Sequence, residues 1–318
     1  MTDNGDLHVV FGTGAVGMSV MDELIRRGTW RVRMVNRNGR ARVPDGVEVI
    51  GGDGTDEAFA REASKGASVV YFALNPPYSK WPELFPKLQA GVLEGAASAG
   101  AKLIAMENLY MYGPTGGRTL TEDLPHAANT RKGRVRAMMS QELMEAHRSG
   151  KVRVAIGRAS DFFGPRVLTS AAGEQVFGRA VQGKSAQVAG DPEQPHTYSY
   201  APDIGRGLVI LGEHEEALGQ AWHLPSPETV TTRQFVEMIF EEAGEPARIQ
   251  AAPKILLRAM GLFNPGMREI IEMLYEFEEP FVVDDSRFER EFGEQATPLR
   301  EAIQRTVRWY REGRPAGT

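Results

Sequence analysis

Short apolar runs and longer stretches of helical periodicity alternate along the first half of the chain. Five runs have the length of buried strands, namely 7–11, 32–35, 68–74, 102–106 and 152–156. Helix-length segments lie between them, notably 15–27, 81–99 and 134–147. Such alternation is typical of βαβ units, because consecutive parallel strands need a crossover helix between them. The pattern predicts an α/β fold, a Rossmann-type doubly wound parallel sheet with helices on both faces.

The pattern loosens after residue 165, where irregular stretches that contain proline and glycine interrupt it. Two later helices are predicted, 233–243 with Thr232 as its N-cap and 299–310 opened by Pro298. Because single cores seldom grow beyond about 250 to 300 residues, a chain of this length has room for a second, smaller unit. We expect two domains: a Rossmann domain over 1–165, with a return segment at about 198–211, and a smaller substrate-binding domain over 166–318.

The composition narrows the function mainly by exclusion. With 42% hydrophobic and 25% charged residues in 318, the chain is an ordinary globular protein rather than a disordered one. The net charge is −5 and no long basic run occurs, so we expect no nucleic-acid partner. The absence of cysteine excludes disulfides, thiolate zinc sites and a cysteine nucleophile.

Nothing in the hydrophobic pattern predicts a membrane segment or an export signal. Residues 1–6 are polar and acidic, and no apolar stretch approaches the roughly 18 residues that span a bilayer. We therefore expect a cytoplasmic protein with no membrane partner. The six histidines show no spacing typical of metal ligands, so we also expect no metal site.

The main chemical signal follows the first apolar run, where three glycines are spaced as G-x-G-x-x-G. Gly12 permits a tight turn, Gly14 lets the backbone approach a diphosphate, and Gly17 allows the next helix to pack closely on the strand. The start of that helix supplies free amides to the phosphates. The motif predicts a bound dinucleotide, with a bare structural turn as the alternative. The other residues of this loop are Thr13, Ala15 and Val16.

The end of the second apolar run indicates which dinucleotide is bound. An acidic residue there would accept a hydrogen bond from the ribose 2′-hydroxyl of NAD. The chain instead has Asn36 followed by Arg37, with Arg40 and Arg42 nearby. A guanidinium can bind a phosphate through two hydrogen bonds, which suits the 2′-phosphate of NADP. We expect NADP to be preferred to NAD; the alternative is that these arginines only form a solvated loop.

Several further motifs occur in the same order as in the short-chain dehydrogenase/reductase superfamily. They are 13–17 (T-G-A-V-G), 52–56 (G-D-G-T-D), 112–113 (Y-G), 121–125 (T-E-D-L-P) and 158–165 (R-A-S-D-F-F-G-P). They resemble the motifs of the extended branch, the NAD-dependent epimerases and dehydratases. The resemblance implies a Rossmann fold and an NAD(P)-dependent oxidoreductase or epimerase. It also implies that the cofactor is lined by Asp53, Gly54, Ala73, Leu74, Asn75, Ala159 and Ser160.

The chain departs from this family at the catalytic residues. The family uses a Tyr and a Lys four residues apart on one helix, where the Lys lowers the pKa of the Tyr. No Tyr-x-x-x-Lys occurs here, Arg134 stands at the Tyr position, and Asn108 replaces the supporting Ser or Thr. We expect Tyr110 to act as acid or base, with Asn108 and Arg134 polarising the substrate oxygen. A catalytically silent protein that binds NAD(P) for redox sensing or regulation is the alternative.

The resemblance implies that the substrate lies beside Tyr112, Asp161 and His196. His196 stands where nucleotide-sugar enzymes of the family hold the substrate diphosphate with an Arg, and a neutral imidazole binds that group poorly. We therefore expect a small carbonyl or hydroxyl compound, with a nucleotide sugar as the alternative. Periodic apolar residues in 254–263 and 267–277 indicate either core or a pocket lining. We expect the chain to be a monomer or a homodimer.

Overall fold

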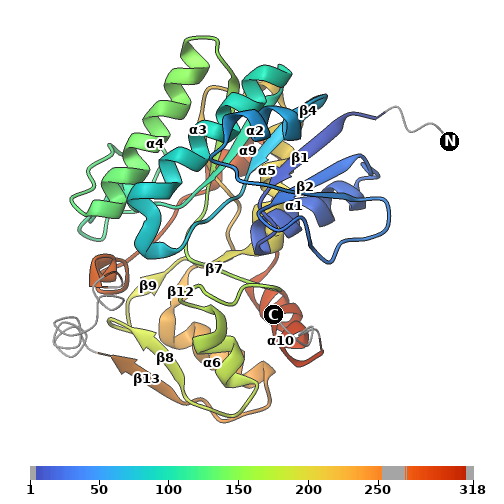
Figure 1. Cartoon of the computed structure of the whole chain (residues 1–318). Coiled ribbons are helices and arrows are strands. Elements are labelled where there is room, and N and C mark those ends of the chain that lie inside the picture. Colours follow the sequence, from blue (N-terminus) through green and yellow to red (C-terminus); the bar gives the residue numbers. More distant parts are fainter. Residues whose placement is uncertain (1–4, 253–268, 270, 313–318) are drawn as a thin grey trace.

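A seven-stranded parallel sheet forms the centre of the computed structural model, which describes residues 5–252, 269 and 271–312. The strand order is β3-β2-β1-β4-β5-β6-β11, and Figure 1 labels β1, β2 and β4 of this sheet. The winding reverses between β1 and β4, and in such sheets ligands bind at the carboxyl ends of the strands beside this point. The strands are β1 (Leu7–Phe11), β2 (Val32–Asn36), β3 (Glu48–Gly51), β4 (Ala67–Phe72), β5 (Lys102–Glu107), β6 (Arg153–Arg158) and β11 (Ala221–His223).

Helices cover both faces of this sheet, so the central strand β1 is buried throughout. Side chains alternate along a strand, and accordingly Val9 and Phe11 belong to the core on one face and Val10 to the core on the other. Gly205 lets two helices of the second face approach closely, because a Cβ there would lie 2.5 Å from the main chain of Ser19. The first face carries α2 (Glu57–Ser64), α3 (Trp81–Ala99) and α4 (Arg131–Arg148), and the second carries α1 (Ala15–Arg26) and α5 (Ala201–Glu213).

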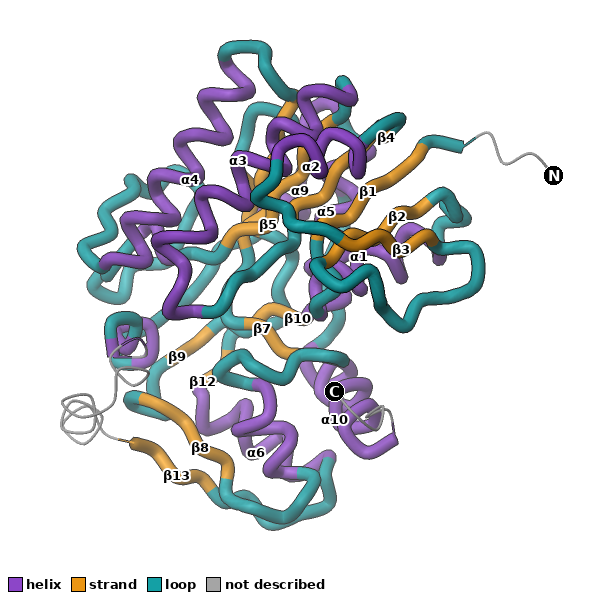
Figure 2. Tube along the Cα trace, viewed as in Figure 1, coloured by secondary structure: helices purple, strands orange, loops and turns teal. Residues whose placement is uncertain are grey.

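Most elements beyond β6, apart from α5, β11 and α9 (Ser286–Phe292), form a smaller part below the sheet in the view of Figure 2. Its core is aromatic: Phe163, Phe177 and Phe235 pack against one another with ring centroids 5.1–5.9 Å apart. Three short strand pairs surround this core, and they are β7 (Phe162–Phe163) with β10 (Ser199–Tyr200), β8 (Ala186–Ala189) with β13 (Ile249–Ala252), and β9 (Pro195–His196) with β12 (Val230–Thr231). The helices of this part are α6 (Thr232–Glu242), α10 (Leu299–Glu312) and the π-helix η3 (Gly173–Gly178), whereas α9 lies against the sheet. Short 3₁₀ turns are η1 (Tyr78–Lys80), η2 (Tyr110–Tyr112), η4 (Glu215–Ala217) and η5 (Leu274–Phe277).

The predicted doubly wound α/β fold is confirmed, and two helix starts need correction. α4 begins at Arg131 rather than at residue 134, because the Thr130 hydroxyl caps it by accepting from the amide of Gly133. The predicted N-cap Thr232 is wrong by one residue. Thr231 is the cap, and it exchanges hydrogen bonds with Gln234 in a capping box.

Several segments beyond residue 165 return to the central sheet. The predicted return at 198–211 overlaps α5, while β11 pairs with β6 and α9 packs on β11 through the rings of Phe288 and Trp222. The apolar stretch 254–263 lies outside the described residues. Within the part of the chain that the structure describes, no helix has the length and apolar character of a transmembrane span.

Candidate active site

In the glycine loop between β1 and α1, two of the three glycines have no room for a side chain and the third, Gly14, has open space beside it. Gly12 has φ +123°, and a Cβ there would lie 2.5 Å from the carbonyl oxygen of Ala73 in the neighbouring loop. A Cβ on Gly17 would lie 2.0 Å from the carbonyl oxygen of Gly12. A Cβ on Gly14, in contrast, would meet nothing within 4 Å. The loop therefore needs its outer glycines for packing and leaves space above the middle one.

The space above Gly14 fits the diphosphate of a dinucleotide. Gly14 is the N-cap of α1, and no side chain caps its helix. The amides of the first turn therefore remain available, and with the helix dipole they favour an anion. Ser160, at the carboxyl end of β6, is buried with a hydroxyl that has no partner among the described residues. Both observations are compatible with the predicted cofactor.

Of the two residues at the end of β2, Asn36 has a structural role and Arg37 is exposed to solvent. The Asn36 amide donates to the Thr13 hydroxyl at 3.0 Å and to the Arg40 carbonyl at 2.8 Å, and its oxygen accepts from two amides of the same loop. Asn36 thus shapes the loop beside the glycines. Arg37 is exposed. Hydrogen bonds from Thr55 lower the pKa of Asp53, and the charge of Arg37 adds to the effect.

A buried ionic network, which we call the Glu107 network, lies beneath the carboxyl ends of β5 and β6. Arg158 donates from Nε to Glu107 at 3.1 Å, and its other nitrogens reach Tyr112 at 2.6 Å and Ser140 at 2.9 Å. Arg136 lies 3.8 Å from the same carboxylate. Arg136 and Arg158 are each at most 3% exposed, so Glu107 balances two cations in a region of low dielectric constant.

The hydroxyl of Tyr112 is fully occupied within this network. His223 Nδ1 faces the carbonyl oxygen of Asp284 at 3.0 Å, so that nitrogen carries the proton and Nε2 accepts from the Tyr112 hydroxyl at 2.9 Å. Burial and the charge of Arg158 lower the pKa of His223 to about 4, which keeps the ring neutral. Tyr112 is 2% exposed. The expectation that Tyr112 contacts substrate is therefore corrected: both of its hydrogen bonds stabilise the fold.

A second polar group, the tyrosine–carboxyl cluster, brings together Tyr78, Tyr110, Asp161, Tyr275 and Glu276. The Tyr78 hydroxyl donates to the Tyr110 hydroxyl at 3.2 Å, which leaves the proton of Tyr110 free for another acceptor. Burial raises the pKa of Tyr110 well above its ordinary value, and the charges of Glu276 and Asp161 add to this. Tyr110 therefore keeps its proton at neutral pH and can donate a hydrogen bond, but it cannot act as a base.

Asp161 and His196, which the sequence motifs assigned to the substrate site, form a pair. His196 Nε2 faces the Asp161 carboxyl at 3.1 Å, and Nδ1 faces the main-chain carbonyl of Glu276 at 3.2 Å. These two contacts fix the ring between the loop after β6 and η5. The His196 ring stacks on Phe277 with centroids 4.9 Å apart and is 2% exposed.

Lys132 lies buried at the first turn of α4, under the cluster. Its ammonium group is 4.3 Å from the ring centroid of Tyr78 and pairs with the carboxylates of Glu269 and Glu272. Lys132 thus makes a cation–π contact with the Tyr78 ring. Its charge is already balanced by two carboxylates, unlike that of the family lysine, which lowers a tyrosine pKa.

The structure does not bring Arg134 into this cluster. Arg134 is exposed and donates to the carbonyl oxygen of Asn129 at 2.6 Å. Its position in the first turn of α4 directs it along the loop, and the buried arginines are Arg136 and Arg158 instead. Asn108 is half-buried and accepts a long hydrogen bond, 3.4 Å, from the amide of Tyr110.

The remaining predicted cofactor residues follow the strands that flank the glycine loop. Ala73 donates its amide to Phe11, and Ala159 donates its amide to Glu107. Gly54 is buried, Leu74 is half-buried and Asn75 is exposed. All of them follow carboxyl ends of strands in the sheet, and Ala73, Leu74 and Asn75 follow β4, beside the point where the winding reverses. No group of three or more potential metal ligands is found in the described part of the chain.

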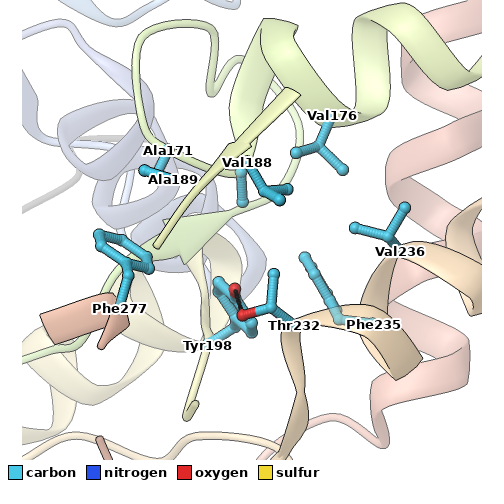
Figure 3. A pocket seen from close by; sticks show the side chains of 10 residues that line it. Ala171, Val176, Val188, Ala189, Tyr198, Thr232, Phe235, Val236 and Phe277 are labelled. Atoms are coloured by element: carbon cyan, nitrogen blue, oxygen red, sulfur yellow. Dashed lines mark hydrogen bonds between the residues drawn. The ribbon is translucent and has the colours of Figure 1, made fainter. Parts of the chain in front are cut away.

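A small apolar pocket lies among aromatic and aliphatic side chains of the smaller part (Figure 3). Its volume is about 30 Å³, enough for about two water-sized groups. Phe277 and Tyr198 line it, and both rings also contact His196, with centroids 4.9 and 4.5 Å away. The other lining residues are Ala171, Ala172, Val176, Val188, Ala189, Thr232, Phe235 and Val236.

The sequence motifs missed Tyr78, Tyr275 and Glu276. Tyr78 follows β4, and its place at a strand end was a usable signal. Tyr275 and Glu276 belong to the described end of the stretch 267–277, whose apolar periodicity indicated core or pocket lining. A carboxyl group inside that apolar pattern was the available hint, since buried carboxyls are rare.

Known proteins similar to this chain include two sequence relatives and a solved structure. The uncharacterized protein y4nL of Sinorhizobium fredii (strain NBRC 101917 / NGR234) is 21% identical over 316 residues, covering 90% of this chain and 87% of that protein. A dTDP-glucose 4,6-dehydratase of Streptomyces griseus is 22% identical over 225 residues, which are 70% of this chain and 63% of that protein. The structure of Thermus thermophilus UDP-glucose 4-epimerase in complex with NAD matches with a TM-score of 0.76 and 18% identity, covering 96% of this chain and 100% of that one.

The model of one protein family, described as the NAD dependent epimerase/dehydratase family, matches residues 9–224. This range contains the glycine loop, Tyr110 and the Asp161–His196 pair. It confirms the resemblance to the extended short-chain dehydrogenases/reductases and the prediction of an NAD(P)-linked oxidoreductase or epimerase. The chain belongs to the NAD dependent epimerase/dehydratase family.

Proposed function

We propose that this enzyme reduces, oxidises or epimerises a small carbonyl or hydroxyl compound, using Tyr110 to bind the reacting oxygen. The observation that carries the proposal is the tyrosine–carboxyl cluster. Tyr78, Tyr110 and Asp161 follow β4, β5 and β6, and the glycine loop follows β1. Parallel strands end at one edge of the sheet, so the cluster and the dinucleotide loop share that edge.

The chemistry assigned to Tyr110 is hydrogen-bond donation rather than proton abstraction. Tyr78 donates to the Tyr110 hydroxyl and thereby directs its proton to another acceptor. A substrate oxygen that gains negative charge during hydride transfer is such an acceptor, and a preorganised donor stabilises it. Asn108, half-buried two residues before Tyr110, is a second donor that we assign to the same oxygen.

We further propose NADP as the preferred cofactor. The Asn36 side chain is committed to its own loop, and Arg37 is exposed next to it. A 2′-phosphate would have an exposed guanidinium to bind, whereas no carboxylate follows β2 to bind a ribose hydroxyl. The cofactor would supply the hydride in a reduction and accept it in an oxidation.

The apolar pocket supports a substrate with a short aliphatic substituent. Its lining offers mainly alanine, valine and aromatic carbon, and two of the lining rings, Phe277 and Tyr198, also contact His196. Burying two methylene-sized groups contributes about 1.6 kcal/mol, equivalent to about a fifteenfold gain in kcat/KM. Ala189→Leu would fill the pocket, and we expect it to abolish that gain for longer aldehydes and to leave acetaldehyde unaffected.

The test is NADPH oxidation with a panel of short aliphatic carbonyls, aromatic carbonyls, UDP-glucose and dTDP-glucose. We expect turnover of the aliphatic compounds and a loss of about 10²–10³ in kcat for Tyr110→Phe, the usual effect of removing one such donor. Tyr71→Phe is the matched control, because its hydroxyl is also buried but bonds to His8 in the core.

Two results would contradict the proposal. NADPH binding without turnover of any compound, unchanged by Tyr110→Phe, indicates a redox-sensing or regulatory protein. Turnover of a nucleotide sugar alone indicates the substrate class of the Streptomyces and Thermus proteins, and then a group other than His196 must bind the diphosphate.

A further inference from the structure

One carboxyl group in the tyrosine–carboxyl cluster has no role in the proposed function. Glu276 lies in η5 and is 1% exposed. Its Oε1 has no hydrogen-bond partner, and no ion pair neutralises it, within the described ranges 5–252, 269 and 271–312. An unpaired carboxylate withdrawn from water is strongly disfavoured, so burial favours the protonated form of this group.

The surroundings of Glu276 come from five separate segments. Tyr78 and Tyr110 approach from the loops after β4 and β5, Asp161 from the end of β6, and Tyr275 from η5 itself. The negative charge of a Glu276 carboxylate would raise the pKa of Tyr78, Tyr110 and Tyr275.

The remaining neighbour is His196 of β9, which fixes the main chain of Glu276 through its carbonyl oxygen. Burial raises the pKa of Glu276 well above its usual value, and the negative charge of Asp161 adds to the shift. Because none of the described residues forms an ion pair with Glu276, the protonated carboxyl is the stable form in the resting site.

We propose that Glu276 is a further catalytic acid, which gives its proton to the substrate oxygen that Tyr110 holds. The inference rests on the proposed function. In the reducing direction the substrate carbon gains the hydride that the cofactor supplies, and the carbonyl π pair moves to oxygen. The O–H bond of Glu276 breaks as its proton bonds to that oxygen. Glu276 is left as a carboxylate and regains a proton from water when the product leaves.

The acidity of the two groups favours Glu276 over Tyr110 for this step. The pKa of Tyr110 starts near 10 and is raised further, whereas that of Glu276 starts near 4.5 and is raised. Burial raises the pKa of both groups, and by its ordinary pKa a carboxyl group is the stronger acid of the two. In the described part of the chain, the lysine of this cluster is Lys132, which contacts the Tyr78 ring and is already paired with Glu269 and Glu272.

The first test needs no substrate. An infrared difference spectrum of wild type minus Glu276→Gln at pH 7 should show the carbonyl stretch of a protonated carboxyl group, which disappears on raising the pH. Glu279→Gln is the matched control, since Glu279 is half-exposed and should contribute a carboxylate band. A carboxylate band for Glu276 at pH 7 would overturn the inference.

The second test uses the carbonyl that the wild type turns over best. Glu276→Gln should melt like the wild type, bind NADPH within about twofold of it, and lose about 10²–10⁴ in kcat. The pH dependence of kcat that the wild type shows should vanish in the variant. Wild-type protein without any turnover refutes the proposed function and this inference together. Turnover by the wild type that Glu276→Gln retains within about threefold refutes this inference alone.

Discussion

Gly14→Ala is expected to weaken nucleotide binding without harming the fold. The main chain of Gly14 has φ −76° and ψ −176°, which alanine adopts freely, and an added Cβ meets nothing within 4 Å. Restricting the unfolded chain should raise the free energy of unfolding by about 0.4–1 kcal/mol. The same methyl group would stand where the diphosphate approaches α1, and we expect a loss of about tenfold in affinity, or about 1.4 kcal/mol.

Urea unfolding with and without NADPH measures both effects. NADPH at about 100 times its Kd should stabilise the wild type by about 2.7 kcal/mol, but Gly14→Ala by only about 1.4 kcal/mol. Gly17→Ala is the matched control, because its Cβ would lie 2.0 Å from the Gly12 carbonyl oxygen. That variant should lose about 1–3 kcal/mol with or without nucleotide. Equal stabilisation of Gly14→Ala and wild type by NADPH would refute binding at this loop.

Three further predictions concern single side chains. Arg37→Ala should weaken NADPH binding by about tenfold and leave NADH unaffected in fluorescence titrations; equal losses would refute the NADP preference. Arg158→Met leaves Glu107 without its closest cation and should cost about 3–5 kcal/mol of unfolding free energy in urea, against under about 0.5 kcal/mol for the exposed Arg148→Met. A loss for Arg158→Met no larger than the control would contradict the buried charge. Because burial lowers the pKa of His223 from 6.5 to about 4, the unfolded chain binds this proton first, and stability should be full above pH 6.5 and fall from there toward pH 4. His223→Gln should remove that part of the pH dependence, and an unchanged profile would show that another group causes it.

The sheet could be predicted from the sequence because its strands are buried on both faces. The run 7–11 is buried throughout and matches β1. The edge strand β3 carries no such run, since all four of its residues are at least partly exposed, and it escaped the prediction. The cap of α6 was misjudged because two threonines are adjacent, and only the reciprocal bond with Gln234 distinguishes them.

The glycine loop was also predictable, because its function depends on spacing within a few residues. Tyr110 could be suspected from its place after a strand. The roles of the arginines could not be assigned, since Arg134 and Arg136 are near neighbours and only packing against Glu107 decides which is buried. The position of Glu276 could not be predicted for a similar reason, because η5 meets His196 only after the chain has folded.

The return of α9 to the sheet has a consequence for Glu276. Just before α9, the carbonyl of Asp284 accepts from His223 and the carboxyl of Asp285 accepts from the amide of Ser226, so this stretch is tied to β11 and the loop that follows it. Glu276, the proposed proton donor, therefore belongs to a segment whose later part, α9, is packed against Trp222. Asp285→Ala would remove the hydrogen bond to Ser226. We expect this variant to have a lower kcat while its affinity for NADPH stays the same.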